Sequence, residues 1–304
     1  MDEESILFGI RNLFALGNYQ SVINDVSSAK GLYSVEAKLE AQAYLYRSYI
    51  AQGKCNLVIT DIGNDVEAPL KAVKLLALYT QAKQKDQASD EIIQQCHALF
   101  EEGANRVHPT IQAVIATVLV KDGRLEDALK VLHVRTKKLE CVALAVQIYL
   151  QMDRLDLARN EVSHAKAWAE DALLLQMMEG WVDLRVGGEK YQEAFYIYEE
   201  FGQSSTAQTI KVLNGQAAAN LTLGRYPEAE SLLLEALTKN SDDPDTLVNM
   251  VVCATLTSKP ADVLNRYVNQ LREVAPQHPF LQDLDLKSSY FDRAAARFAL
   301  VDAS

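Results

Sequence analysis

The chain repeats a short pattern about every 35 residues, and this period constrains its fold more than any other feature. In each copy a turn is followed by a bulky residue and, three positions later, by a small or β-branched one, as in Gly224-Arg225-Tyr226 to Ala229. The last residues of the copies are Val22, Val58, Ala128, Ala158, Ala194, Ala229 and Val263. Their spacings are 36, 70, 30, 36, 35 and 34 residues, and the 70 corresponds to two periods. Such a period predicts an array of helical hairpins rather than one globular core.

The double period should contain a degenerate hairpin, and helical segments can be read there over 70–83 and 89–102. The best-preserved copy, over 209–240, matches the tetratricopeptide pattern at Ala217, Gly224, Tyr226, Ala229, Ala236 and Leu237. Its small residues let two helices approach closely, and its glycine permits the left-handed conformation that ends a helix. We therefore predict an all-α, TPR-like α-solenoid: a right-handed superhelix of about eight helical hairpins. It should form a single domain over 1–304, with a C-terminal capping helix over 280–300.

Charge narrows the range of partners. The chain has 30 Lys+Arg against 41 Asp+Glu, a net charge of -11 and an isoelectric point near 5.0. Nucleic acid and anionic lipid headgroups carry the same sign of charge, so neither is expected as a direct partner. The acidic start Met1-Asp2-Glu3-Glu4 does not resemble a targeting signal, and no apolar run approaches the ~20 residues of a membrane span. We expect a cytosolic protein that reaches membranes only through a partner.

The tetratricopeptide register also predicts which residues of the first helix in each hairpin face a concave groove. The residues assigned to this groove are mostly small or apolar: Val114, Thr117, Val120, Leu144, Gln147, Leu150, Ala218, Leu221, Val248, Asn249 and Val252. An empty groove of this kind would expose more contiguous apolar surface than a soluble monomer usually tolerates, so a partner segment should fill it. If the register is shifted by one position, these residues belong instead to the core between helices.

The sequence contains little that points to other chemistry. Receptors for acidic C-terminal peptides need a basic and amide clamp, but here only Asn249 fits its middle position and Asn214 stands where a lysine is required. Phosphate loops, dinucleotide fingerprints, HExxH and GxSxG motifs are absent from the sequence. In the projected groove only Glu179 and Asp183 bring two acids near each other. We expect no catalytic residue, no metal and no cofactor.

Several short stretches outside the repeat pattern are more specific: Gln151-Met152-Asp153-Arg154-Leu155, Leu213-Asn214-Gly215-Gln216-Ala217, Asp245-Thr246-Leu247-Val248-Asn249, His278-Pro279-Phe280 and Phe291-Asp292-Arg293. In this order and spacing they resemble the epsilon-subunit family of coatomer, the COPI vesicle coat. The resemblance extends from Leu13 to Phe298, and the chain departs from it over 83–90.

The resemblance implies a non-enzymatic structural subunit whose helical array encloses and stabilises the C-terminal region of the coatomer alpha subunit. The remaining coatomer subunits would be contacted only indirectly. It further implies Golgi-to-ER retrograde and intra-Golgi transport, in the cytoplasm and on the cytosolic face of Golgi membranes and COPI vesicles. Two other hypotheses remain: a generic TPR adaptor for short peptides, stable as a free monomer, and an enzyme built on a helical toroid.

Overall fold

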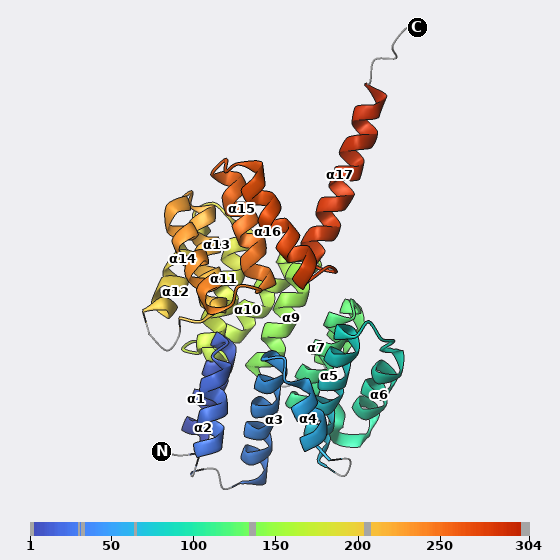
Figure 1. Cartoon of the computed structure of the whole chain (residues 1–304). Helices are drawn as coiled ribbons and strands as arrows, with labels where there is room; N and C mark the ends of the chain where they lie inside the picture. The colour runs from blue at the N-terminus through green and yellow to red at the C-terminus, as the bar shows by residue number, and fades with distance from the viewer. Residues whose placement is uncertain are drawn as a thin grey trace. The chain divides into compact units, whose positions relative to one another are not determined.

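The secondary structure is entirely helical in the part of the chain that this computed structural model describes (Figure 1). That part comprises residues 3–29, 31, 34–63, 66–133, 138–203 and 208–298. Contacts group the helices into two compact units, which we call unit 1 (residues 1–207) and unit 2 (residues 208–304). That the two act as one continuous solenoid stays a prediction.

Unit 1 contains the helices α1 (Glu3–Leu16), α2 (Tyr19–Ser28), α3 (Val35–Ala51), α4 (Cys55–Asp61), α5 (Ala68–Gln84), α6 (Asp90–Glu101), η1 (Gly103–Val107), α7 (Pro109–Lys121), α8 (Leu125–Leu132), α9 (Leu139–Gln151), α10 (Leu155–Ala169), α11 (Leu173–Val186) and α12 (Lys190–Gly202). Unit 2 contains α13 (Ile210–Thr222), α14 (Tyr226–Lys239), α15 (Pro244–Leu256), α16 (Ala261–Val274) and α17 (Pro279–Arg297).

The predicted all-α hairpin array is confirmed. Each odd-numbered helix from α1 to α15 packs against the even-numbered helix that follows it, which gives eight hairpins in the described part of the chain. We call the first helix of each hairpin its A helix and the second its B helix. The degenerate third hairpin is formed by α5 and α6, where the sequence predicted it.

Left-handed residues end the A helices at the predicted turns. Gly123 and Gly224 have φ angles of 81° and 73°, a region that costs an L-residue about 1 to 2 kcal/mol because its Cβ crowds the backbone. In other hairpins Asp153 and Ser258 adopt the same conformation, with φ angles of 58° and 52°. The turn therefore keeps its left-handed geometry in hairpins where a residue other than glycine stands at this position.

Replacing Gly123 by alanine should lower the free energy of unfolding by about 1 to 2 kcal/mol, because the left-handed φ is strained for any residue with a Cβ. The matched control is Gly9→Ala inside α1, which should raise it by about 0.5 to 1 kcal/mol by restoring helix propensity. No described atom lies within 4 Å of a Cβ at either position, so backbone conformation alone separates the two variants. Urea denaturation checks both, and equal effects would contradict the explanation.

The core of unit 1 is built mainly by its A helices. A continuous apolar cluster runs from α3 to α11 and includes the fully buried Ile115 and Ile148. The A helices pack side by side in chain order, and α1 also contacts α11. The first and last A helices of unit 1 therefore meet.

Unit 2 has its own apolar cluster around Leu233, Leu247 and Leu271, drawn from α13 to α17. The predicted C-terminal helix forms as α17, but Figure 1 shows it extending away from α16. Leu281 is only 2% exposed, whereas Phe291 and Phe298 are 73% and 86% exposed. The structure thus differs from the expected cap over 280–300: only the start of α17 contacts the last hairpin, through Leu281 and an ion pair of Asp285 with Arg272 at 2.7 Å, and residues 286–298 are exposed. Residues 299 and 300 lie outside the described residues.

Candidate functional site

The groove residues predicted in unit 1 lie on two neighbouring A helices, α7 and α9, which pack against each other. Val114 is fully buried in the core and so offers no surface to a partner. The remaining five keep part of their surface: Thr117, Val120, Leu144 and Leu150 are half-buried, and Gln147 is exposed. The Thr117 hydroxyl donates to the carbonyl of Ala113 at 2.7 Å, so its hydrogen is used within α7.

The groove residues predicted in unit 2 lie on the adjacent A helices α13 and α15. Leu221 is buried in the core, whereas Ala218, Val248, Asn249 and Val252 are half-buried. Val248 and Val252 pack against the apolar cluster with one side and keep the other accessible. Together with Ala218 they offer apolar side chains, which suit an apolar partner surface.

Asn249 belongs to a hydrogen-bonded group that joins α13 to α15. Its Nδ2 donates to Oδ1 of Asn214 at 2.9 Å. Asn214 Nδ2 in turn donates to the Thr246 hydroxyl at 2.8 Å and to the carbonyl of Ile210 at 3.0 Å. The Thr246 hydroxyl donates to Oδ2 of Asp243 at 2.6 Å. These hydrogen bonds begin at Asp243, just before α15, and together they fix the orientation of the Asn249 side chain.

Unit 1 holds a partly buried charged cluster that sequence reasoning did not predict. Arg47 on α3 is 9% exposed and forms an ion pair with Glu140 at the start of α9. The hydroxyl of Tyr44 donates to the other carboxylate oxygen of Glu140 at 2.9 Å. The Arg47 guanidinium lies 4.5 Å from the ring centroid of Phe14 on α1. Burial raises the pKa of Glu140, but the charge and hydrogen bonds of Arg47 and the Tyr44 hydroxyl outweigh burial, so the pKa is lowered overall.

A second ion pair lies beside the first and joins the same helices. Arg11 on α1 donates to both oxygens of Glu40 on α3, at 2.8 and 3.0 Å. Lys138, next to the start of α9, lies 3.4 Å from Glu40. Burial raises the pKa of Glu40, but the bonds from Arg11 and the charges of Arg11 and Lys138 outweigh burial, so the pKa is lowered overall. Polar contacts therefore connect hairpins one, two and five.

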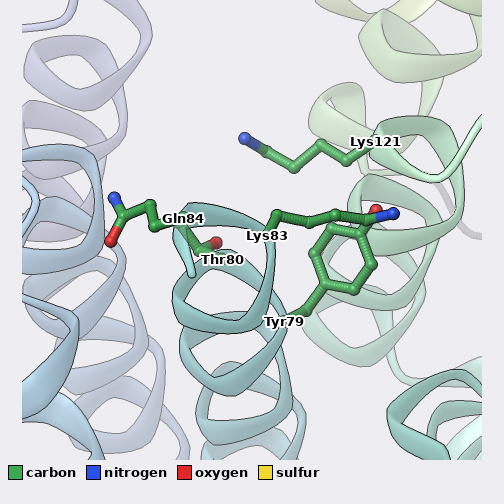
Figure 2. Close-up of a pocket in the computed structure, with 5 residues that line it drawn as sticks. All are labelled: Tyr79, Thr80, Lys83, Gln84 and Lys121. Carbon is green, nitrogen blue, oxygen red and sulfur yellow. The ribbon is translucent and has the colours of Figure 1, made fainter. Parts of the chain in front are cut away.

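A small hollow of about 360 Å³ lies at the C-terminal ends of α5 and α7 (Figure 2). Figure 2 shows the side chains of Lys83 and Lys121 running in opposite directions across it, above the ring of Tyr79. Lys83 pairs with Asp122 at 3.3 Å, and the Tyr79 hydroxyl donates to the same carboxylate at 3.2 Å. Both lysines stand in the last turns of their helices, where cations complement the helix dipole. None of the predicted groove residues lines this hollow.

Glu179, one of the two acids expected to lie near each other, pairs with Lys166 at 3.0 Å. Burial raises the pKa of the Cys96 thiol to about 12, which keeps it protonated near neutral pH. No group of three or more His, Cys, Asp or Glu side chains that could hold a metal occurs in the described ranges. Nor is any helix among them long and apolar enough to cross a membrane.

The hairpins and their left-handed turns define a tetratricopeptide-like α-solenoid. Solved structures of this fold agree. The APC/C hetero-tetramer Cut9-Hcn1 aligns with a TM-score of 0.61 and 15% identity over 90% of this chain and 53% of that one. A tetratricopeptide repeat protein from Parabacteroides merdae aligns with a TM-score of 0.57 and 12% identity over 88% of this chain and 96% of that one.

The family model described as "Coatomer epsilon subunit" matches residues 3–299. Coatomer subunit epsilon-2 of Oryza sativa subsp. japonica is 38% identical over 95% of both chains, and coatomer subunit epsilon-1 of Arabidopsis thaliana is 35% identical over 96% of this chain and 97% of that one. Coatomer subunit epsilon of Dictyostelium discoideum is 30% identical over 97% of this chain and 99% of that one. The chain belongs to the coatomer epsilon-subunit family. It is a structural component of a coat and not an enzyme.

Proposed function

We propose that this chain binds and stabilises the C-terminal region of the coatomer alpha subunit. Its membership of the epsilon-subunit family, over residues 3–299, is the observation that supports this proposal most strongly. The A-helix faces add a physical reason. Leu144 in unit 1 and Val252 in unit 2 are half-buried apolar side chains, and a partner that covered them would remove apolar area from water.

The proposal extends to the cellular role. As a part of the COPI coat the chain would support Golgi-to-ER retrograde and intra-Golgi transport, working in the cytoplasm and on the cytosolic face of Golgi membranes and COPI vesicles. It would meet the remaining coatomer subunits indirectly, and the membrane only through the coat. A net charge of -11 supports this last point, since anionic headgroups repel an acidic chain.

The test is the double variant Leu144→Glu with Val252→Glu. We expect it to weaken binding of the C-terminal region of the alpha subunit by more than about 100-fold, because a charge buried without a partner costs several kcal/mol. Isothermal titration calorimetry with that region, purified, measures the loss. The two single variants report on the two units separately.

The matched control is the pair Leu57→Glu and Leu234→Glu. These leucines are 47% and 48% exposed and stand on B helices, one in each unit. The control should bind as the parent chain does, and circular dichroism should show equal helical content in both variants. If the Leu144 and Val252 variant co-purifies with the alpha subunit at the parent yield, the proposed faces are not the binding surface. A free monomer that instead binds many short peptides would favour the generic adaptor.

A further inference from the structure

The donor and the acceptor of each hydrogen bond around Asn249 can be assigned in order, starting from Asp243. Asp243 is a carboxylate and only accepts, so the Thr246 hydroxyl must donate to it, at 2.6 Å. The Thr246 oxygen then accepts from Asn214 Nδ2. Because that amide nitrogen also donates to the carbonyl of Ile210, the opposite atom of Asn214 has to be the oxygen. This oxygen can only accept, so Asn249 turns its nitrogen towards it.

The series leaves one carboxamide edge of Asn249 open. Its Oδ1 receives no hydrogen bond from any described residue, and one of its two Nδ2 hydrogens is used by Asn214. The side chain is half-buried, and its neighbours on α15, Val248 and Val252, are half-buried valines. Asn249 therefore presents a fixed acceptor with a donor beside it, next to apolar side chains.

A donor and an acceptor side by side are complementary to a peptide group. Main-chain amides of an extended segment offer an N–H and a C=O that no intrasegment bond occupies, whereas a helix uses these groups internally. Ala218, Val248 and Val252 offer no charge to a ligand side chain, and the one charged residue of α15, Asp245, lies a turn earlier and 3.7 Å from His278. The arrangement thus favours the main chain of an extended polypeptide with small or apolar side chains.

We propose that Asn249 binds the main chain of an extended segment of another coatomer subunit, with Asn214 and Thr246 acting as positioning residues. This rests on the proposed function, because it takes the C-terminal region of the alpha subunit as the source of the segment. The valines on either side cover apolar side chains of the segment, and Asn249 sets its register.

The experiment compares Asn249→Ala with Asn214→Ala in titrations against the purified C-terminal region of the alpha subunit. Asn249→Ala should weaken binding by at least about tenfold, since two hydrogen bonds are lost. Asn214→Ala should weaken it as well, although less, because Asn249 loses its orientation while its own groups remain. The matched control is Asn265→Ala on the B helix α16, where the side chain is exposed, and it should bind as the parent chain does.

A second measurement separates main-chain from side-chain recognition. Double-mutant cycles between Asn249→Ala and alanine substitutions along the partner segment should show no coupled side chain, because a main-chain contact survives every such substitution. A strongly coupled partner side chain would overturn the inference, as would parent-like binding by Asn249→Ala. If the unmodified chain itself does not bind this region of the alpha subunit, the proposed function fails instead.

Discussion

Replacing Arg47 by methionine is expected to lower the free energy of unfolding by about 3 to 5 kcal/mol. The substitution leaves the Glu140 carboxylate against α3 with the Tyr44 hydroxyl as its hydrogen-bond partner and the charge of Lys138 in place of the ion pair. It also removes the guanidinium that lies over the Phe14 ring. Methionine keeps much of the apolar volume of the arginine stem, so the loss reports on charge rather than on a cavity. Urea denaturation followed by circular dichroism measures it.

The double variant Arg47→Met with Glu140→Gln is the control, because it removes both charges together. It should recover much of the lost stability, since a buried ion pair as a whole contributes little beyond its desolvation cost. The lowered pKa of Glu140 fixes the pH dependence: the stabilisation is present above the unfolded-state pKa and is lost as the pH falls through the folded one. The double variant should lack this acid-dependent loss. A change below about 1 kcal/mol in Arg47→Met would show that the pair is solvated.

Leu233→Ala should destabilise unit 2 by about 2 to 5 kcal/mol. Leu233 on α14 is 0% exposed and packs with Leu247 and Leu271, so its removal leaves a cavity in a cluster that comprises few side chains. The next residue supplies the control: Leu234 is 48% exposed, and Leu234→Ala should change stability by less than about 0.5 kcal/mol.

Hydrogen exchange measured by mass spectrometry identifies the helices that Leu233→Ala destabilises. Protection should fall in peptides from α13 to α16, and peptides from the core of α7 and α9 should report whether unit 1 is affected. Similar exchange in the two leucine variants would contradict the assignment of Leu233 to the core.

The repeat was sufficient to predict the hairpins because each A and B helix pair depends on contacts close in the sequence. The turn at Gly123, and even the degenerate hairpin of α5 and α6, follow from the period alone. Spacing was less successful in separating buried from accessible positions. Val114 and Thr117 are three residues apart on one helix, yet only Val114 is fully buried, because α7 packs against helices on several sides.

No local sequence pattern indicated the contacts between distant repeats. Arg47 and Glu140 are 93 residues apart, and either residue alone is typical of a solvated helix face. The Asn214 and Asn249 pair could have been found, because the two lie 35 residues apart, one period of the array. Sequence reasoning assigned Asn249 to the groove and tested both residues against a lysine-containing clamp, but did not pair them with each other. The exposed end of α17 differs from prediction for the same reason: periodicity indicates a helix but not what faces it.

The contact between α3 and α9 has a consequence for the order of folding. An array with only neighbouring contacts can begin to fold at any hairpin and grow from there. In unit 1 the guanidinium of Arg47 pairs with the carboxylate of Glu140, 93 residues later in the chain. A nascent chain must therefore lengthen by 93 residues before α3 gains this charge partner. During synthesis the Arg47 guanidinium therefore has no Glu140 carboxylate to pair with until the fifth hairpin has emerged from the ribosome.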